Sequence, residues 1–278
     1  MKKTWKYAIS GAEHTPMTAP LVLEGSLYEL MEKARTYGYD ALEFHTRENY
    51  DFDLDRIAAL RETGKGDICT LATGRLYTQG GCCLLGDTQQ SVDGAMNGMQ
   101  TYIDKAAALG CDVVLGLAKG DVKPGEDRGE VMARLAGRLQ VLSDYAAQRK
   151  VRILLEVINH YETNTLNTAE EIMTFFEQYG LSNCYVHLDT FHMGIEEFDP
   201  CAAIRRCGKR LGYLHIADNS RRYPGSGQFD FARILSALAE VGYDGYVSLE
   251  CFPEPDRDTT ARKTIEHLHD CEKRAGIQ

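Results

Sequence analysis

The chain has 278 residues, of which 44% are hydrophobic and 26% charged, and its formal net charge is −10. This composition is ordinary for a globular protein. The acidic balance argues against a nucleic-acid partner, because phosphate binding needs a basic face. No apolar run approaches the roughly 20 residues that span a bilayer, so we expect no membrane partner either.

Nine cysteines are scattered along the chain, and none of them forms a CxxC pair. Several lie inside apolar runs, where a thiol behaves as a small hydrophobic side chain. The lysines near the N-terminus are not followed by the apolar stretch that a signal peptide needs. These features predict reduced thiols and a cytoplasmic location.

In the first half of the chain, short apolar runs alternate with longer amphipathic ones. Ser26 with Glu29 has the spacing of a helix capping box, and Gly38 is typical of the end of that helix. By the same criteria of periodicity and boundary residues, the expected strands are 7–10, 41–45, 67–73 and 112–117, and the expected helices are 26–37, 54–62, 91–109 and 128–149.

The second half repeats this rhythm more clearly. Its expected strands are 152–158, 184–189, 211–216 and 246–251, with helices at 168–179 and 259–273. Eight strands separated by helix-length segments predict parallel βαβ units that close into a single α/β domain, a (β/α)8 TIM barrel over residues 1–278. The alternative, an open doubly wound sheet, would need a phosphate-cradling glycine loop, and neither Gly80-Gly81 nor residues 116–120 supply one.

Four polar residues interrupt the last four strands, each at or near the C-terminal end. They are Glu156, Asp189, His215 and Glu250, and each is about one βα unit from the next. Barrel enzymes keep their active sites at this rim, so the four should converge there. Three clustered carboxylates repel one another without a cation, so the set predicts one bound divalent metal ion. Oxygen ligands with one nitrogen and no thiolate suit Mn²⁺, Mg²⁺ or Co²⁺ and do not exclude Zn²⁺.

The segments around these four residues resemble the ketose 3-epimerase group. The matching segments are residues 155–162, 166–168, 188–197, 215–227 and 248–250. The group includes D-tagatose 3-epimerase, D-psicose 3-epimerase and 5-keto-L-gluconate epimerase, and it belongs to the xylose-isomerase-like TIM-barrel superfamily. In the first half, residues 71–77 and 114–120 are most similar to the 5-keto-L-gluconate epimerase branch.

The resemblance implies an isomerase of carbohydrate metabolism, a metal-dependent 3-epimerase. Its substrate would be an unphosphorylated ketose or keto-hexonate, inverted at the carbon beside the ketone. Glu156 and Glu250 would be both metal ligands and the acid/base pair, and Asp189 and His215 would be ligands only. Mn²⁺ is the ion that we expect first, and we expect a homodimer or a homotetramer.

The resemblance also implies substrate contacts. Glu162, His192 and Arg221 match positions that contact substrate oxygens or orient the catalytic carboxylates. Two departures from the group lie beside them. Relatives usually read Ser-Asn where this chain has Asn219-Ser220, which puts the placement of Arg221 in question. They usually have Arg where this chain has His160.

Further charged residues follow the earlier strands. Lys119 and Arg75 come after the fourth and third strands, and each is either a substrate contact or a surface charge. Glu43 ends the second strand, where it either bonds the sugar or pairs with a basic neighbour. No phosphate-type glycine loop follows the last two strands, and Gly225-Ser226-Gly227 is the nearest candidate.

The chemistry of epimerisation fits this residue set. A proton on carbon beside a ketone is too weak an acid for an unaided carboxylate. A divalent ion chelated by the carbonyl and the neighbouring hydroxyl oxygen would stabilise the ene-diolate that forms. Inversion requires a base on one face of that plane and an acid on the other, which Glu156 and Glu250 could provide.

Other functions remain open at this point. A sugar isomerase or a lyase, similar to hydroxypyruvate isomerase or inosose dehydratase, would use the same four ligands. A DNA-repair endonuclease of the same superfamily would need extra histidines after strands three and four and a basic surface, and the chain offers neither. A non-catalytic sugar sensor has no need for both glutamates.

Overall fold

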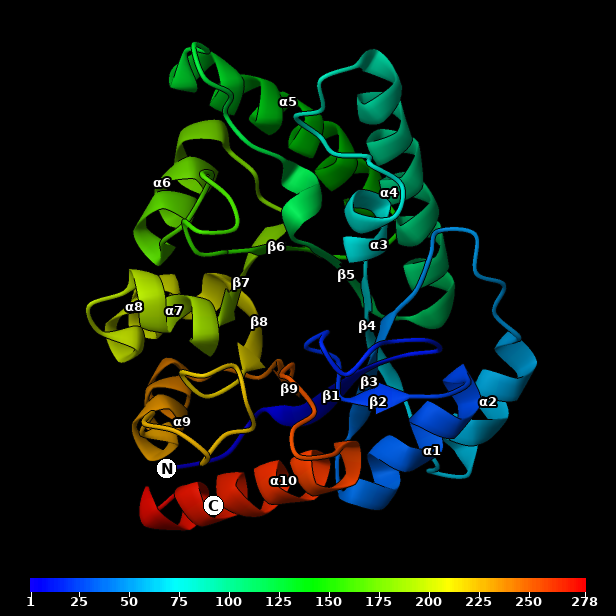
Figure 1. Cartoon of the computed structure of the whole chain (residues 1–278), viewed down its shortest axis with the longest axis vertical. Helices are drawn as coiled ribbons and strands as arrows, with labels where there is room; N and C mark the ends of the chain where they lie inside the picture. Colours follow the sequence, from blue (N-terminus) through cyan, green and yellow to red (C-terminus); the bar gives the residue numbers. More distant parts are fainter.

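The computed structural model describes all residues, 1–278, and eight of its strands close into a parallel barrel (Figure 1). Each barrel strand pairs with the next one along the chain, and β1 closes the ring by pairing with β9. The barrel strands are β1 (Lys6–Ala12), β3 (Ala41–His45), β4 (Ile68–Ala72), β5 (Asp112–Leu115), β6 (Ile153–Glu156), β7 (Cys184–Asp189), β8 (Leu211–Ile216) and β9 (Tyr246–Leu249). The two-residue β2 (Leu23–Glu24) pairs with the C-terminal end of β1. The prediction of a single-domain (β/α)8 barrel is confirmed.

Helices surround this barrel on its outer side (Figure 1). They are α1 (Leu27–Tyr37), α2 (Leu54–Glu62), α3 (Gly74–Thr78), α4 (Gln89–Leu109), α5 (Arg128–Ala147), α6 (Ala169–Tyr179), α7 (Thr190–Glu196), α8 (Pro200–Cys207), α9 (Phe231–Val241) and α10 (Arg257–Arg274), with 3-10 turns η1 (Leu117–Lys119) and η2 (Gly208–Arg210). The capping box at the start of α1 is formed, and Gly38 ends that helix with a left-handed φ of 94°.

Several short elements were not predicted from the sequence. The two-residue β2 and the helices α3 and α7, of five and seven residues, are too short to show a periodic apolar pattern. The helices α8 and α9 were not predicted either, although they are longer. Each begins after an aspartate whose side chain accepts a backbone N–H: Asp199 from Cys201 and Asp230 from Ala232. The predicted strands were confirmed with ends displaced by up to two residues.

The inner face of the barrel explains how polar residues reach one place. Its buried cluster is drawn from several strands: Ala8, Ala41, Cys69, Ala72, Val114, Leu154 and Tyr213. Side chains alternate along a strand, so the residue two positions further on shares that face. Two positions beyond Ala41, Leu154 and Tyr213 stand Glu43, Glu156 and His215. The apolar interior therefore gives way to charged groups at the C-terminal rim.

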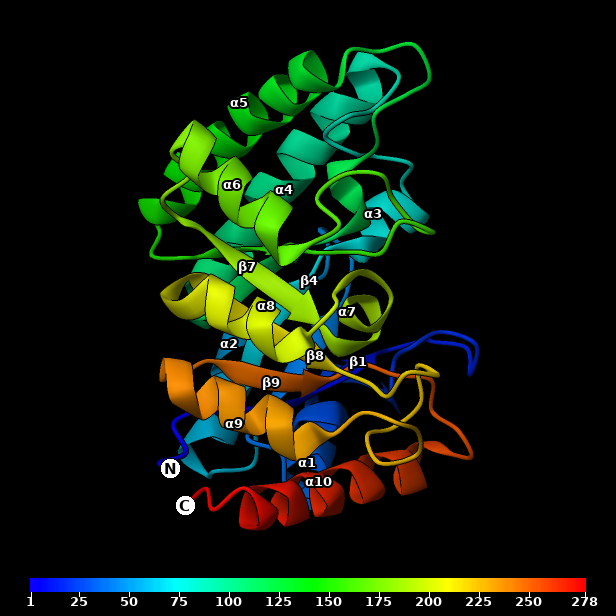
Figure 2. The same ribbon diagram turned by 90° about the vertical axis from the view of Figure 1, so that its left-hand side faces the viewer.

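The two ends of the barrel differ in what they carry. The strands point toward the end where the long loops gather, and both chain termini lie at the opposite end (Figure 2). There the Lys3 N–H donates to the Gln278 carbonyl at 2.8 Å. No helix combines the length and the apolar character needed to cross a membrane.

Candidate active site

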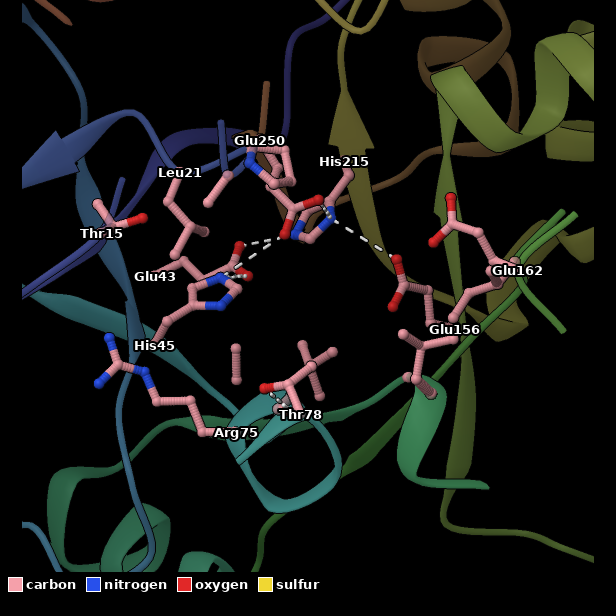
Figure 3. Close-up of a pocket in the computed structure, with 18 of the residues that line it drawn as sticks. Thr15, Leu21, Glu43, His45, Arg75, Thr78, Glu156, Glu162, His215 and Glu250 are labelled. Carbon is pink, nitrogen blue, oxygen red and sulfur yellow. Dashed lines mark hydrogen bonds and ion pairs between the residues drawn. The ribbon is translucent and has the colours of Figure 1, made fainter. Parts of the chain in front are cut away.

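The four predicted metal ligands converge at the loop-bearing rim. Glu156 ends β6, Asp189 ends β7, His215 lies in β8, and Glu250 directly follows β9. The Nδ1 atom of His215 is 3.5 Å from Glu250 Oε2 and 4.0 Å from Glu156 Oε1. An Asp189 oxygen lies within 4.8 Å of Glu156, in a group that also holds His192. A cavity of about 360 Å³ opens above them (Figure 3).

Two buried atoms in this group have no hydrogen-bond partner in the protein. They are Asp189 Oδ2 and His215 Nδ1. The other oxygen of Asp189 is engaged, because it accepts the Phe191 N–H at 2.8 Å. Leaving a buried polar atom unpaired costs about 1–3 kcal/mol, so such atoms usually have a partner that is not protein. A carboxylate oxygen and an imidazole nitrogen left open beside two further carboxylates fit a divalent cation.

The carboxylates of the group differ in their protonation. Burial, together with the charges of Glu250 and Asp189, raises the pKa of Glu156 to about 8. Burial also raises the pKa of Asp189 to about 6. At Glu250 burial acts in the same direction, but in the metal-free protein the protonated ring of His215, whose own pKa is raised by Glu43 and Glu250, and the charge of Arg221 outweigh it and lower the pKa of Glu250 to about 2. The two predicted acid/base residues therefore differ strongly in pKa, which is typical of catalytic carboxylate pairs.

Arg221 lies over the cavity, where it joins two acidic residues. Its guanidinium donates to Glu162 Oε1 at 3.3 Å and to Glu250 Oε2 at 3.4 Å, and it stacks 4.7 Å from the centre of the Phe191 ring. Its backbone is left-handed, with a φ of 57°, which is uncommon outside glycine and concentrates at functional sites. The unusual Asn219-Ser220 order thus leaves Arg221 facing the site.

His192, on α7, is buried against the same carboxylates. The side-chain amide nitrogen of Asn159 lies 2.6 Å from His192 Nδ1 and also donates to Glu162 Oε1 at 3.1 Å. Since an amide N–H can only donate, Nδ1 accepts and Nε2 carries the proton. That Nε2 faces Glu156 Oε1 at 3.9 Å and Asp189 Oδ2 at 3.8 Å. Burial and the charge of Arg221 lower the pKa of His192 to about 3, so its ring is neutral.

The two remaining predicted substrate contacts, Arg75 and Lys119, differ in whether they reach the cavity. Arg75 lines the cavity on the side opposite Glu162 (Figure 3). The only hydrogen bond of its side chain donates to the His14 carbonyl at 2.9 Å, and the side chain forms no ion pair. Lys119 is fully buried and does not line the cavity, and its amine has no partner. Burial lowers its pKa to about 8 against the opposing charge of Glu156.

The glycine loop after β8 is occupied by a side chain of the protein. The buried carboxylate of Asp218 accepts the backbone N–H groups of Asn219, Gly225, Gly227, Gln228 and Phe229 at 2.8–3.1 Å. A backbone nest of this kind can bind a phosphate. Here the amides already have an anionic partner.

Comparison with known proteins agrees with this geometry. The family model described as xylose isomerase-like TIM barrel matches residues 31–271. The chain belongs to this family. A ketose 3-epimerase of Arthrobacter globiformis is 32% identical over 235 residues, which cover 82% of this chain and 78% of that protein. The resemblance to the ketose 3-epimerase group is thereby confirmed.

Two further relatives of this xylose isomerase-like barrel are similar over different lengths. An L-ribulose 3-epimerase of Methylomonas sp. (strain DH-1) is 39% identical over 142 residues, and this match spans 51% of the chain and only 50% of that protein. The crystal structure of a D-allulose 3-epimerase from Methylomonas sp. in complex with D-allulose aligns with a TM-score of 0.79 at 26% identity. It covers 96% of this chain and 97% of that one.

His45, for which the sequence predicts no role, is placed in the site by the barrel. It ends β3, lines the cavity, and lies 3.0 Å from Glu43 and 3.7 Å from Glu250. A signal was present, because His45 follows Glu43 by two residues and so shares its face of the strand. Two roles were expected for Glu43, a bond to the sugar or a pair with a basic neighbour. The structure shows the pair, because Glu43 bonds His45 and His215.

Proposed function

We propose that this protein is a metal-dependent epimerase that inverts the carbon beside the ketone of an unphosphorylated ketose or keto-hexonate through an ene-diolate. The observation that carries the proposal is the placement of Glu156, Asp189, His215 and Glu250 at one rim, where three of them line one cavity and two of their buried atoms are unpartnered. The names of the epimerase relatives support the same reaction class.

These four residues would hold one divalent ion, Mn²⁺ in the first instance, with Mg²⁺, Co²⁺ or Zn²⁺ as alternatives. Such an ion supplies electrostatic stabilisation of the negative charge that develops on the substrate oxygens. The protein's own groups move the proton. Glu156 and Glu250 approach His215 Nδ1 from β6 and from beyond β9, so they can serve opposite faces of a substrate.

The other two contacts expected from the sequence, Arg221 and His192, orient this pair. Arg221 binds Glu250 with one nitrogen and Glu162 with another, which fixes the Glu250 carboxylate over the cavity. The neutral His192 directs its Nε2–H toward Glu156 and Asp189. Both side chains line the cavity, where they can also donate to substrate hydroxyls. Holding the reacting groups in place in this way is a large part of enzymatic rate enhancement.

The shape and charge of the cavity bear on the substrate. Its volume of about 360 Å³ lies within the usual range for small-molecule sites. The nearest phosphate-type loop is filled by Asp218, which favours an unphosphorylated sugar. Arg75 lies on the cavity wall without an acidic partner, and it could pair with a terminal carboxylate. Lys119, being buried outside the cavity wall, would act through its charge.

Two further predictions complete the proposal. The nine cysteines are all free, which supports a cytoplasmic location. A homodimer or homotetramer stays a prediction.

Competition among three matched substrates tests the proposal: a ketohexose, its terminal phosphate ester and its terminal carboxylate, each assayed with Mn²⁺. We expect the neutral sugar or the acid to have the highest kcat/KM. A clear preference for the phosphate ester would overturn the substrate class. A preference for the neutral sugar over the acid would remove the carboxylate role of Arg75 and leave the epimerase proposal standing.

A further inference from the structure

The most heavily bonded carboxylate that lines the cavity is Glu43, which is not one of the predicted ligands. It is fully buried in the middle of β3, two residues before His45 ends the strand. Its Oε2 accepts from His215 Nε2 at 2.8 Å, from the Tyr213 hydroxyl at 2.9 Å and from the Ser248 hydroxyl at 2.8 Å. Its Oε1 accepts from His45 Nε2 at 3.0 Å. Oε2 is therefore fully engaged by three donors, and Oε1 is held by His45, so protein groups hold both oxygens of Glu43.

The bond to Glu43 decides which nitrogen of His215 is free. Because Nε2 faces a carboxylate oxygen, it carries the proton and donates. The other nitrogen, Nδ1, is the unpartnered one, and it faces Glu156 and Glu250. Metal-binding histidines almost always donate their second N–H to a carboxylate or carbonyl, which fixes the tautomer and the ring orientation.

His45 extends this arrangement to a second residue of the site. Its Nε2 lies between Glu43 Oε1, at 3.0 Å, and Glu250 Oε1, at 3.7 Å (Figure 3). The other oxygen of Glu250 faces His215 Nδ1 at 3.5 Å and Arg221 at 3.4 Å. Glu43 therefore touches one predicted ligand directly and reaches another through His45.

An ordinary buried ion pair in the core is the plainest alternative. Such pairs seldom stabilise a fold on balance, because the cost of removing charges from water offsets their attraction. In this barrel both ends of the network are groups whose free atoms face the same cavity. An ion pair that only stabilised the fold would not need to contact groups that face the cavity.

We propose that Glu43 and His45 are positioning residues, which act through His215 and Glu250 and do not contact the reacting atoms. Glu43 holds the His215 ring with Nδ1 toward the ion, and His45, fixed by its bond to Glu43, packs 3.7 Å from the Oε1 oxygen of Glu250 and limits where that carboxylate can lie. This inference rests on the proposed function, in which His215 and Glu250 are ligands.

The test measures Mn²⁺ affinity by the electron paramagnetic resonance signal of the free ion, which needs no turnover. In Glu43→Gln the charge is lost and the amide cannot satisfy all four donors. We expect its Mn²⁺ dissociation constant to rise about 10–100-fold. Ser248→Ala is the matched control, because it removes one donor from the same oxygen and leaves both histidine bonds in place. We expect its affinity to change by no more than about threefold, because the bond that orients the His215 ring and the charge of Glu43 both remain.

Glu43→Gln protein that folds and binds Mn²⁺ as tightly as wild type would overturn the role of Glu43. If that variant does not fold, Glu43→Asp replaces it, because it keeps the charge and shortens the reach. Weakened Mn²⁺ binding in Glu43→Asp supports the proposal, and wild-type affinity overturns it.

The His45→Gln variant tests the contact of His45 with Glu250 separately from the contact of Glu43 with His215. We expect kcat at saturating Mn²⁺ to fall at least about tenfold, with a smaller change in Mn²⁺ affinity than in Glu43→Gln. Unchanged kcat would overturn the role of His45. Wild-type protein that binds Mn²⁺ without epimerising any ketose would contradict the proposed function alone, since the affinity comparison would still stand. Wild-type protein that binds no Mn²⁺ would overturn both.

Discussion

Glu156 and Glu250 carry the same side chain in different surroundings. Glu156 is buried near other carboxylates and has no basic group within 3.5 Å, whereas Glu250 lies beside both His215 and Arg221. The first environment favours the neutral carboxyl group and the second favours the anion. A pair that must exchange one proton with opposite faces of a substrate benefits from this asymmetry.

Replacing either glutamate with glutamine tests this pair. The amide keeps an oxygen that can face the ion but cannot accept a proton from carbon. We expect Glu156→Gln and Glu250→Gln each to lower kcat by at least about 10²–10⁴-fold while the circular dichroism spectrum is unchanged. Near-normal turnover in either variant would show that this glutamate is only a ligand.

The raised pKa values of Glu156 and Asp189 predict how metal binding depends on pH. A cation binds the deprotonated carboxylates, so Mn²⁺ affinity should rise from about pH 5 and level off above about pH 8. Titration calorimetry in buffers of different ionisation enthalpy should detect proton release at pH 7. Affinity that is flat over this range would contradict the assignment of these two carboxylates.

The same shifts predict the stability of the metal-free protein. The folded-state pKa of Glu156, about 8, lies above the ordinary value of 4.5. Its contribution to stability is therefore fully present below about pH 4.5 and is lost as the pH rises through 8. Denaturant unfolding in a chelator at several pH values measures this trend, to which other titrating groups also contribute.

At the scale of elements, the loop between β8 and α9 sets the position of Arg221. The Arg221 N–H donates to the Asp218 carbonyl, and the Asp218 carboxylate binds five amides further along the loop. Asp218 thus stabilises the turn from which Arg221 reaches Glu250 and Glu162.

Asp218→Ala should therefore affect both stability and catalysis. Five partly buried amides would lose a charged acceptor, so we expect the free energy of unfolding to fall by at least about 2 kcal/mol and kcat/KM to fall with it. Asp230→Ala is the control, because Asp230 only caps α9; it should cost about 1 kcal/mol and leave kcat/KM unchanged. Equal effects of the two substitutions on kcat/KM would contradict this role of Asp218.

The sequence predicts some parts of the fold and the site but not others, depending on the element that carries them. The four candidate ligands were predictable because each interrupts an apolar strand at its C-terminal end, where barrel geometry brings successive strands together. The partners of Glu43 could not be predicted from the sequence. They come from β3, β8 and β9, and their contact with Glu43 depends on closure of the barrel. The burial of Lys119 depends on the 3-10 turn η1, whose three residues show no periodic pattern.

At the scale of the whole molecule, ion binding should be coupled to global stability, because the predicted ligands come from four different strand ends. An ion at about 100 times its dissociation constant stabilises the folded state by about 2.7 kcal/mol. For a domain of this size we expect the melting temperature to rise by roughly 5–10 °C with Mn²⁺. The Asp189→Ala/His215→Ala double variant should show no rise; a wild-type shift in that variant would contradict the ligand set.

Solvent exchange at carbon tests the central claim most directly. Wild-type protein is incubated with Mn²⁺ and a panel of unphosphorylated ketoses and keto-hexonates in D₂O, and the products are followed by NMR. The account predicts a substrate that gains one deuterium at the carbon beside the ketone while its epimer appears, with Glu156→Gln and Glu250→Gln inactive. Epimer formed without deuterium at that carbon, or no exchange into any member of the panel, would contradict it.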